Sequence, residues 1–288
     1  MSNRRRPLVF YKMHSLGNDF MVIDAVTQSV ELDPQAIMRW GDRHTGIGFD
    51  QLLVIEPPTE PTADFCYRIY NSDGSSAQQC GNGTRCVAML VRHLRLSKQT
   101  SLHWQSAAGM LRTEYENPEQ IETTMTVPVL ALPDIPFDPS AATATSQADL
   151  SPYRIAVDGE NYDIMPVSMG NPHGVMFFDD IFNIDVPGIG QKLTRHEAFP
   201  EGANIGFCQV IDRQFIRLRV FERGTGETRA CGSGACAAVV AARLQDKVGE
   251  RVKVSLPGGK LRIAWPDERS PVTMTGAANL VFRGELHT

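Results

Sequence analysis

Two short segments of the sequence share a Cys-Gly-x-Gly pattern that precedes small and apolar residues. The first begins at Cys80 and reads CGNG, and the second begins at Cys231 and reads CGSG. If each segment opens a helix, the positive end of the helix dipole and unpaired backbone N–H groups favour the thiolate and should lower the pKa of the cysteine. The glycines let a ligand approach those N–H groups, which suit a carboxylate. Each segment therefore predicts a reactive thiol beside a carboxylate-binding turn.

Two such thiols in one chain indicate a particular kind of proton transfer. A thiolate can remove the α-proton of an amino acid from one face while a thiol supplies a proton to the opposite face, and the two exchange roles in the reverse direction. Backbone N–H groups stabilise the charge that moves onto the carboxylate. We therefore expect Cys80 and Cys231 to face one ligand and to invert its α-carbon.

Other uses of the cysteines and glycines fit the sequence less well. No C-x-x-C is present, and pairs separated by five or six residues do not share a helix face, so we expect no metal site. Neither glycine segment completes G-x-G-x-x-G or a P-loop, which argues against a nucleotide site. The remaining cysteines lie in strand or apolar helix patterns and are predicted to pack in the core: Cys66, Cys86, Cys208 and Cys236.

The segments around the two cysteines are repeated as well. Asn71 lies nine residues before Cys80, and Glu222 lies nine residues before Cys231. Upstream, IGFDQ ends at Gln51 and matches IGFCQ, while LGND matches MGNP earlier still. Three matches in the same order indicate a duplication that produced two similar halves.

The boundary between the halves falls in a segment rich in Pro, Ala, Ser and Thr, near residues 127–152. We assign residues 1–126 to an N-terminal half-site domain and residues 127–275 to a C-terminal half-site domain. Residues 279–286 have a strand pattern, and we expect the segment 276–288 to complete the first domain.

Local patterns predict the elements that position the two thiols. Apolar and charged residues alternate over 216–220, as in a half-buried strand, and residues 253–265 read as a hairpin around Pro257-Gly258-Gly259. Residues 86–94 and 235–244 are apolar almost all round and predict buried helices. The predicted fold is α/β (α+β), with two pseudo-symmetric domains that each wrap a curved, mostly antiparallel sheet around one buried helix.

Composition narrows the class of protein. The chain has 288 residues, of which 42% are hydrophobic, and a net charge of −5, so we expect no nucleic-acid partner. No apolar run is long enough to cross a bilayer, and LVFYKMHSLG does not form a signal-peptide core. These features predict a cytoplasmic protein that does not associate with membranes.

Six segments, between His14 and Ala238, resemble motifs of the diaminopimelate epimerase family: HSLGNDF, GFDQ, NSDGSSAQQCGNGTRC, GNPHGV, GANIGF and ERGTGETRACGSGACAA. The resemblance implies an isomerase that uses no cofactor and interconverts L,L- and meso-2,6-diaminopimelate for lysine and peptidoglycan synthesis. It also implies two similar α/β domains, the diaminopimelate epimerase-like fold, and a homodimer.

The resemblance assigns roles to residues of this chain. Cys80 and Cys231 are the implied acid/base pair, and the turns Gly81-Asn82 and Gly232-Ser233 are implied to hold the reacting carboxylate. Arg223 suits the distal carboxylate and Glu222 the distal ammonium, while His173 and Glu222 are implied to tune the thiols. The implied substrate contacts outside the turns are Asn18, Gln51, Asn71, Asn171, Asn204, Glu222 and Arg223. For the asparagines, turn formation is the competing explanation, most seriously for Asn171 before Pro172.

The sequence departs little from the family pattern. Ser15 replaces the usual glycine, Ser76 stands where Glu is common, and Phe282 occupies a position where some members have a Tyr at the dimer contact. Two alternatives remain: an enzyme resembling proline or hydroxyproline racemases, and a non-catalytic, redox-sensitive thiol binding module. Adjacent Glu222 and Arg223 argue against the racemase, since a small cyclic amino acid lacks a second charged end.

Overall fold

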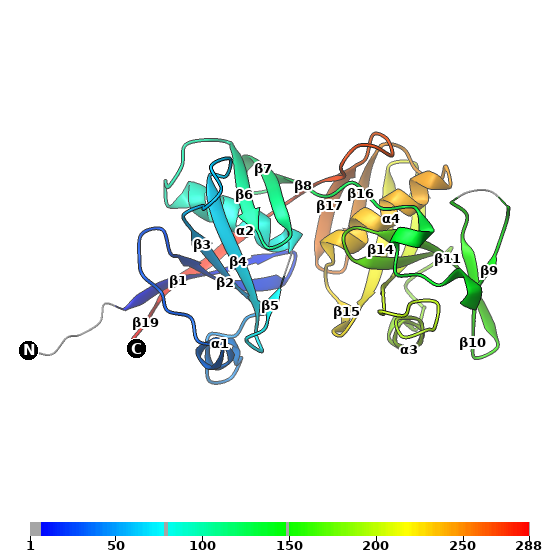
Figure 1. The fold of residues 1–288 in the computed structure, drawn as a ribbon, viewed down its shortest axis with the longest axis horizontal. Coiled ribbons are helices and arrows are strands. Elements are labelled where there is room, and N and C mark those ends of the chain that lie inside the picture. Colours follow the sequence, from blue (N-terminus) through cyan, green and yellow to red (C-terminus); the bar gives the residue numbers. More distant parts are fainter. Residues whose placement is uncertain (1–6, 78–79, 148–149, 288) are drawn as a thin grey trace, which may run out of the picture. The chain divides into compact units, whose positions relative to one another are not determined.

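The structure, a computed structural model, describes residues 7–77, 80–147 and 150–287, which form two compact units (Figure 1). The first unit contains the chain up to Thr123 together with the segment from Gly276 onwards, and the second contains Thr124–Thr275. Within the described part of the chain, no helix is long and apolar enough to span a membrane.

The first unit is built on a mixed sheet with strand order β19-β1-β2-β3-β4-β6-β7. Within it, β2 and β3 are parallel, as are β4 and β6, and the other neighbouring strands are antiparallel. The short strand β5 pairs with β4. The elements are β1 (Leu8–Ser15), β2 (Asn18–Asp24), α1 (Pro34–Gly41), β3 (Gln51–Glu56), β4 (Phe65–Asn71), β5 (Ser76–Ala77), α2 (Gly81–His93), β6 (Ser101–Ser106), β7 (Gly109–Asn117), β8 (Gln120–Thr124) and β19 (Asn279–Leu286).

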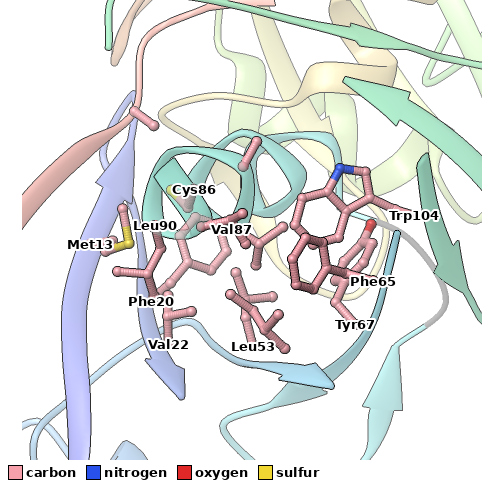
Figure 2. Packing of buried hydrophobic residues seen from close by; sticks show 14 of the residues in the cluster. Met13, Phe20, Val22, Leu53, Phe65, Tyr67, Cys86, Val87, Leu90 and Trp104 are labelled. Atoms are coloured by element: carbon pink, nitrogen blue, oxygen red, sulfur yellow. The ribbon is translucent and has the colours of Figure 1, made fainter. Parts of the chain in front are cut away.

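Helix α2 fills the larger core of this unit. Figure 2 shows Cys86, Val87 and Leu90 of the helix packed among side chains of the strands, with Phe20 and Leu53 below them and Trp104 to the side, all of them fully buried. Because side chains alternate along a strand, the intervening residues of β2 and β3 pack in a second cluster that includes Ile37 of α1. The sheet is therefore apolar on both faces, and α2 packs against one of them through the residues between Cys86 and Val91.

The second unit has the strand order β10-β11-β12-β13-β14-β16-β17-β18. Again two neighbouring pairs are parallel, β12 with β13 and β14 with β16. The elements are η1 (Leu132–Asp134), η2 (Pro139–Ala141), β9 (Thr143–Ala144), β10 (Tyr153–Val157), β11 (Glu160–Ser168), β12 (Pro172–Phe177), α3 (Val186–Leu193), β13 (Asn204–Asp212), β14 (Phe215–Glu222), β15 (Gly226–Thr228), α4 (Gly232–Leu244), β16 (Arg251–Leu256), β17 (Gly259–Ala264) and β18 (Thr273–Gly276).

The two units match strand for strand. The series β2, β3, β4 and α2 corresponds to β12, β13, β14 and α4, with the same parallel and antiparallel pairs. Strand β1 of the first unit is flanked by β19, as β11 of the second is flanked by β10. The predicted fold class, with two pseudo-symmetric sheets that each hold a buried helix, is thereby confirmed. The predicted hairpin is β16–β17, and the predicted C-terminal strand is β19.

Candidate active site

Both cysteines of the repeated pattern are helix N-caps. Cys80 precedes α2 in an extended conformation, and its sulfur accepts a hydrogen bond from the N–H of Gly83 at 3.4 Å. Cys231 precedes α4 in the same conformation, and its sulfur accepts from the N–H of Gly234, also at 3.4 Å. The expectation that each Cys-Gly-x-Gly segment opens a helix is confirmed, and each sulfur takes the capping position that an oxygen usually occupies.

The second glycine of each segment is tightly packed. A Cβ on Gly83 would lie 3.1 Å from a methyl group of Leu53. On Gly234 it would lie 3.1 Å from Val220 and 3.2 Å from the sulfur of Cys231. The sequence alone predicts only that these glycines let a ligand approach the backbone N–H groups. The structure adds that each allows the capping sulfur and the sheet to lie close to the first turn.

An amide network surrounds the Cys80 sulfur. The amide oxygen of Asn18 lies 3.7 Å from this sulfur and accepts a hydrogen bond from the side chain of Asn82 at 3.3 Å. The amide nitrogen of Asn18 donates to Asp50 at 2.8 Å. Asp50 also accepts a hydrogen bond from the guanidinium of Arg43 at 2.7 Å. Asp50 was not among the predicted residues. Its only signal in the sequence is its place beside Gln51 in the repeated motif.

Strand register brings the other predicted residues of this unit to the same end of the sheet. Asn18 and Gln51 begin the parallel strands β2 and β3, whereas Asn71 ends the antiparallel strand β4. Gln51 and Asn71 are register partners, and the amide of Gln51 donates to that of Asn71 at 3.1 Å. Polar side chains thus gather at the ends of these strands that lead towards Cys80.

The surroundings of Cys231 favour the protonated thiol. Burial raises the pKa of Cys231 well above its usual range, and the charge and hydrogen bond of Glu222 raise it further. Ser233 and the N–H of Gly234 act in the opposite direction. The prediction of a lowered thiol pKa is therefore wrong for Cys231, because desolvation and a nearby carboxylate outweigh the helix N-terminus.

Four further predicted residues are linked within the second unit. His173 is fully buried, and its Nε2 lies 3.1 Å from the amide oxygen of Asn171. Its register partner across the parallel strands is Asn204, whose amide oxygen accepts from the backbone N–H of Arg223 at 2.9 Å. Desolvation, and then the charge of Arg223, lower the pKa of His173 to about 3. The imidazole is therefore neutral at physiological pH.

The guanidinium of Arg223 is exposed and donates to the carbonyl of Glu201 at 2.7 Å. Glu222 accepts a hydrogen bond from the hydroxyl of Thr228. Phe282 lies on β19, is 46% exposed, and packs edge-on against Phe10. In the part of the chain that the structure covers, no three His, Cys, Asp or Glu side chains are grouped to hold a metal ion.

Comparisons with known proteins identify the same family along nearly the whole chain. The family model for diaminopimelate epimerase matches residues 10–131 and 165–281. A diaminopimelate epimerase from Ectopseudomonas mendocina (strain ymp) is 46% identical over 97% of this chain and 99% of its own length. The diaminopimelate epimerase from Pseudomonas fluorescens (strain Pf0-1) is 48% identical over the same shares.

Solved structures with low sequence identity share the fold. A hydroxyproline epimerase from Agrobacterium vitis has a TM-score of 0.67 at 14% identity, covering 98% of this chain and 93% of its own. A predicted epimerase from Pseudomonas aeruginosa has a TM-score of 0.67 at 18% identity, covering 99% of this chain and 100% of its own.

Proposed function

The chain belongs to the diaminopimelate epimerase family, and on this premise we propose that it interconverts L,L- and meso-2,6-diaminopimelate with Cys80 and Cys231 as its two acid/base groups. The observation that carries the proposal is the pair of equivalent caps: each sulfur lies 3.4 Å from the third backbone N–H after it, at the start of a buried helix. An enzyme that inverts a carbon needs one proton-transfer group for each face, and the chain has two such groups in matching positions.

The proposed reaction conserves protons at every step. One cysteine thiolate takes the α-proton as the C–H bond breaks, and the electron pair is delocalised into the carboxylate. The other cysteine thiol then gives its proton to the opposite face of the carbon. After one turnover the thiolate and thiol have exchanged positions, and the reverse reaction restores them. The sequence of steps needs no cofactor.

The first-turn N–H groups of α2 and α4 support this reaction, because backbone N–H groups at the start of a helix attract a negatively charged ligand. Gly81-Asn82 and Gly232-Ser233 would bind the carboxylate beside the reacting carbon. Charge on that carboxylate grows in the transition state, so these hydrogen bonds strengthen as the proton leaves.

The environment of Cys231 favours one protonation state of its thiol. Burial and Glu222 hold Cys231 in its protonated form. Cys231 in this form would act as the acid in one direction of the reaction, and in that direction Cys80 must act as the base. A substrate of the other configuration needs the reverse arrangement.

Diaminopimelate carries a second amino-acid group at its far end, which requires charges of both signs. The exposed guanidinium of Arg223 suits the distal carboxylate, and Glu222 suits the distal ammonium. Amide side chains complete the proposed set of substrate contacts: Asn18, Gln51, Asn71, Asn171 and Asn204. His173, neutral and adjacent to Asn171, would tune the thiols together with Glu222.

We also propose that the protein acts in the cytoplasm as a homodimer, in the synthesis of lysine and peptidoglycan precursors. The adjacent side chains of Val281 and Phe282 on β19 are 56% and 46% exposed, and such apolar exposure on an outer strand supports a contact with a second copy.

Incubation with L,L-diaminopimelate in D2O tests the proposed function. The expected products are the meso isomer and substrate labelled with deuterium at the α-carbon. Faster turnover of proline than of diaminopimelate would favour a racemase instead. Absence of turnover with either compound, combined with a reversible disulfide, would favour a thiol binding module.

A further inference from the structure

A buried guanidinium lies directly behind the turn that carries Cys80. Arg85 is 0% exposed. Its guanidinium donates to the carbonyl of Gly81 at 3.3 Å, to the side-chain oxygen of Asn82 at 2.5 Å and to the hydroxyl of Ser15 at 2.8 Å. A charged group removed from water is costly unless hydrogen bonds replace its hydration, so this arrangement fixes Arg85 in one position.

Two of these acceptors belong to the residues whose N–H groups form the proposed carboxylate-binding turn. Gly81 and Asn82 are the first two residues of α2. Because the side-chain oxygen of Asn82 accepts from Arg85, its amide nitrogen is directed at Asn18, 3.3 Å away. Arg85 therefore determines both where the turn lies and which way the Asn82 amide faces.

Ser15 holds the guanidinium from the other side. Its hydroxyl accepts from Arg85 and donates to the carbonyl of Ala277 at 2.7 Å. The end of β1 and the segment before β19 thereby brace the start of α2. This position is also the one where the sequence has a serine in place of the usual glycine.

The equivalent position of the second half-site holds a different residue. Arg85 lies five residues after Cys80, and the residue five positions after Cys231 is Cys236, which is equally buried. Conversely, the position equivalent to Asn71 holds Glu222. One half-site thus has a buried cation behind its turn, and the other has a carboxylate beside its thiol.

We propose that Arg85 is a positioning residue of the Cys80 half-site, a role that rests on the proposed function. Its guanidinium holds the Gly81-Asn82 turn and the Asn82 amide in the geometry that binds the reacting carboxylate. Ser15 keeps the guanidinium in place. The role belongs to the first half-site, because the equivalent position after Cys231 holds Cys236.

Three variants test the proposal: Arg85→Met, Arg85→Lys and Ser15→Ala. Arg85→Met should lower kcat roughly 10²-fold, as small displacements of reacting groups do, with a smaller change in KM. Ser15→Ala removes one hydrogen bond to a charged group and should lower kcat about 10-fold. Arg85→Lys keeps the charge without the planar fork, so its kcat should lie between those of the wild type and Arg85→Met.

Arg92→Met is the matched control. Arg92 lies at the opposite end of α2, where its guanidinium donates to the carbonyl of Ser97. Its loss should lower the melting temperature without changing kcat. A loss of kcat in Arg92→Met equal to that in Arg85→Met would overturn the proposal, since it would reveal a general effect of weakening the helix.

A second readout does not depend on turnover. In Arg85→Met, alkylation of Cys80 by iodoacetamide at fixed pH should slow, whereas Cys231 should keep its wild-type rate. If Arg85→Met does not fold, kcat and the alkylation rate of Cys80 in Arg85→Lys and Ser15→Ala test the proposal instead. Folded variants with wild-type kcat and unchanged alkylation of Cys80 would overturn the role of Arg85. A wild-type protein that does not epimerise diaminopimelate would instead overturn the proposed function.

Discussion

Asp50 determines the direction in which the side chain of Asn18 faces. It accepts a hydrogen bond from the amide nitrogen of Asn18 at 2.8 Å, which leaves the amide oxygen 3.7 Å from the sulfur of Cys80. An ionised carboxylate has no proton to donate, so Asn18 cannot present its oxygen to Asp50 instead. The group that faces the thiol is therefore an acceptor.

Replacing Asp50 by Asn should remove this orientation. An amide at position 50 can donate as well as accept, so both orientations of Asn18 become possible, and we expect kcat to fall roughly 10-fold, the effect of one hydrogen bond to a charged group. Steady-state kinetics measures this. Asp73→Asn, in the turn after β4, is the control and should leave kcat unchanged; an equal loss there would contradict the role of Asp50.

The two capping cysteines should differ sharply from the core cysteines. Cys80→Ala and Cys231→Ala should each lower epimerisation by roughly 10⁴-fold, because each removes one half of a two-group proton transfer. Cys86→Ala and Cys236→Ala remove a buried sulfur and should lower mainly stability. Turnover and thermal unfolding separate the two classes. Near-normal epimerisation by either capping variant would refute the two-thiol mechanism.

Glu222→Gln should make Cys231 more reactive towards alkylation. The charge of Glu222 raises the pKa of Cys231, so its removal lowers that pKa and increases the thiolate fraction at a given pH. Iodoacetamide labelling followed by mass mapping gives the rate at Cys231. Glu227→Gln is the control, since Glu227 pairs with Arg219 at 2.7 Å and should not affect Cys231. A slower rate in Glu222→Gln would contradict the assigned direction.

His173 should make the protein less stable in acid. Its pKa is about 3 in the folded state and near 6.5 when unfolded, so below pH 6.5 the unfolded state binds a proton that the folded state does not. The contribution of His173 is complete above pH 6.5 and is lost as the pH falls towards 3. Between pH 6.5 and pH 5 the loss is about 2 kcal/mol.

Chemical denaturation at several pH values compares the wild type with His173→Gln, which should show a flatter dependence of the unfolding free energy on pH. His44→Gln, which replaces an exposed histidine, is the control. Identical slopes for wild type and His173→Gln would show that His173 is not the group responsible.

Gly234→Ala should damage the Cys231 half-site. The new Cβ would meet Val220 at 3.1 Å and the Cys231 sulfur at 3.2 Å, so these side chains must give way, at a cost of about 1–3 kcal/mol. Gly206→Ala is the control, because its nearest neighbour is 3.6 Å away. Unfolding free energies and kcat should both fall in Gly234→Ala alone; equal effects in both variants would contradict the steric account.

Local features were predictable from the sequence, whereas features that depend on the surroundings were not. The helices after Cys80 and Cys231 follow from a capping residue, glycines and a long apolar run, which are properties of neighbouring residues. The raised pKa of Cys231 depends on burial by residues distant in sequence, which no local pattern reports. The tight packing at Gly83 arises from Leu53 on strand β3, thirty residues earlier. The buried position of Arg85 likewise follows from packing against Ser15, seventy residues earlier.

Because β19 pairs with β1, the two units are completed at different stages of synthesis. All residues of the second unit lie between Thr124 and Thr275, so it has its whole sequence as soon as that segment leaves the ribosome. The first unit begins to emerge earlier, yet β1, which pairs with β2 on one side, lacks its partner on the other side until residues 279–286 have been made. Translation proceeds at about 5–20 residues per second, so the outer edge of β1 stays unpaired for roughly ten seconds or more. The half that is made first is thus the last to be completed.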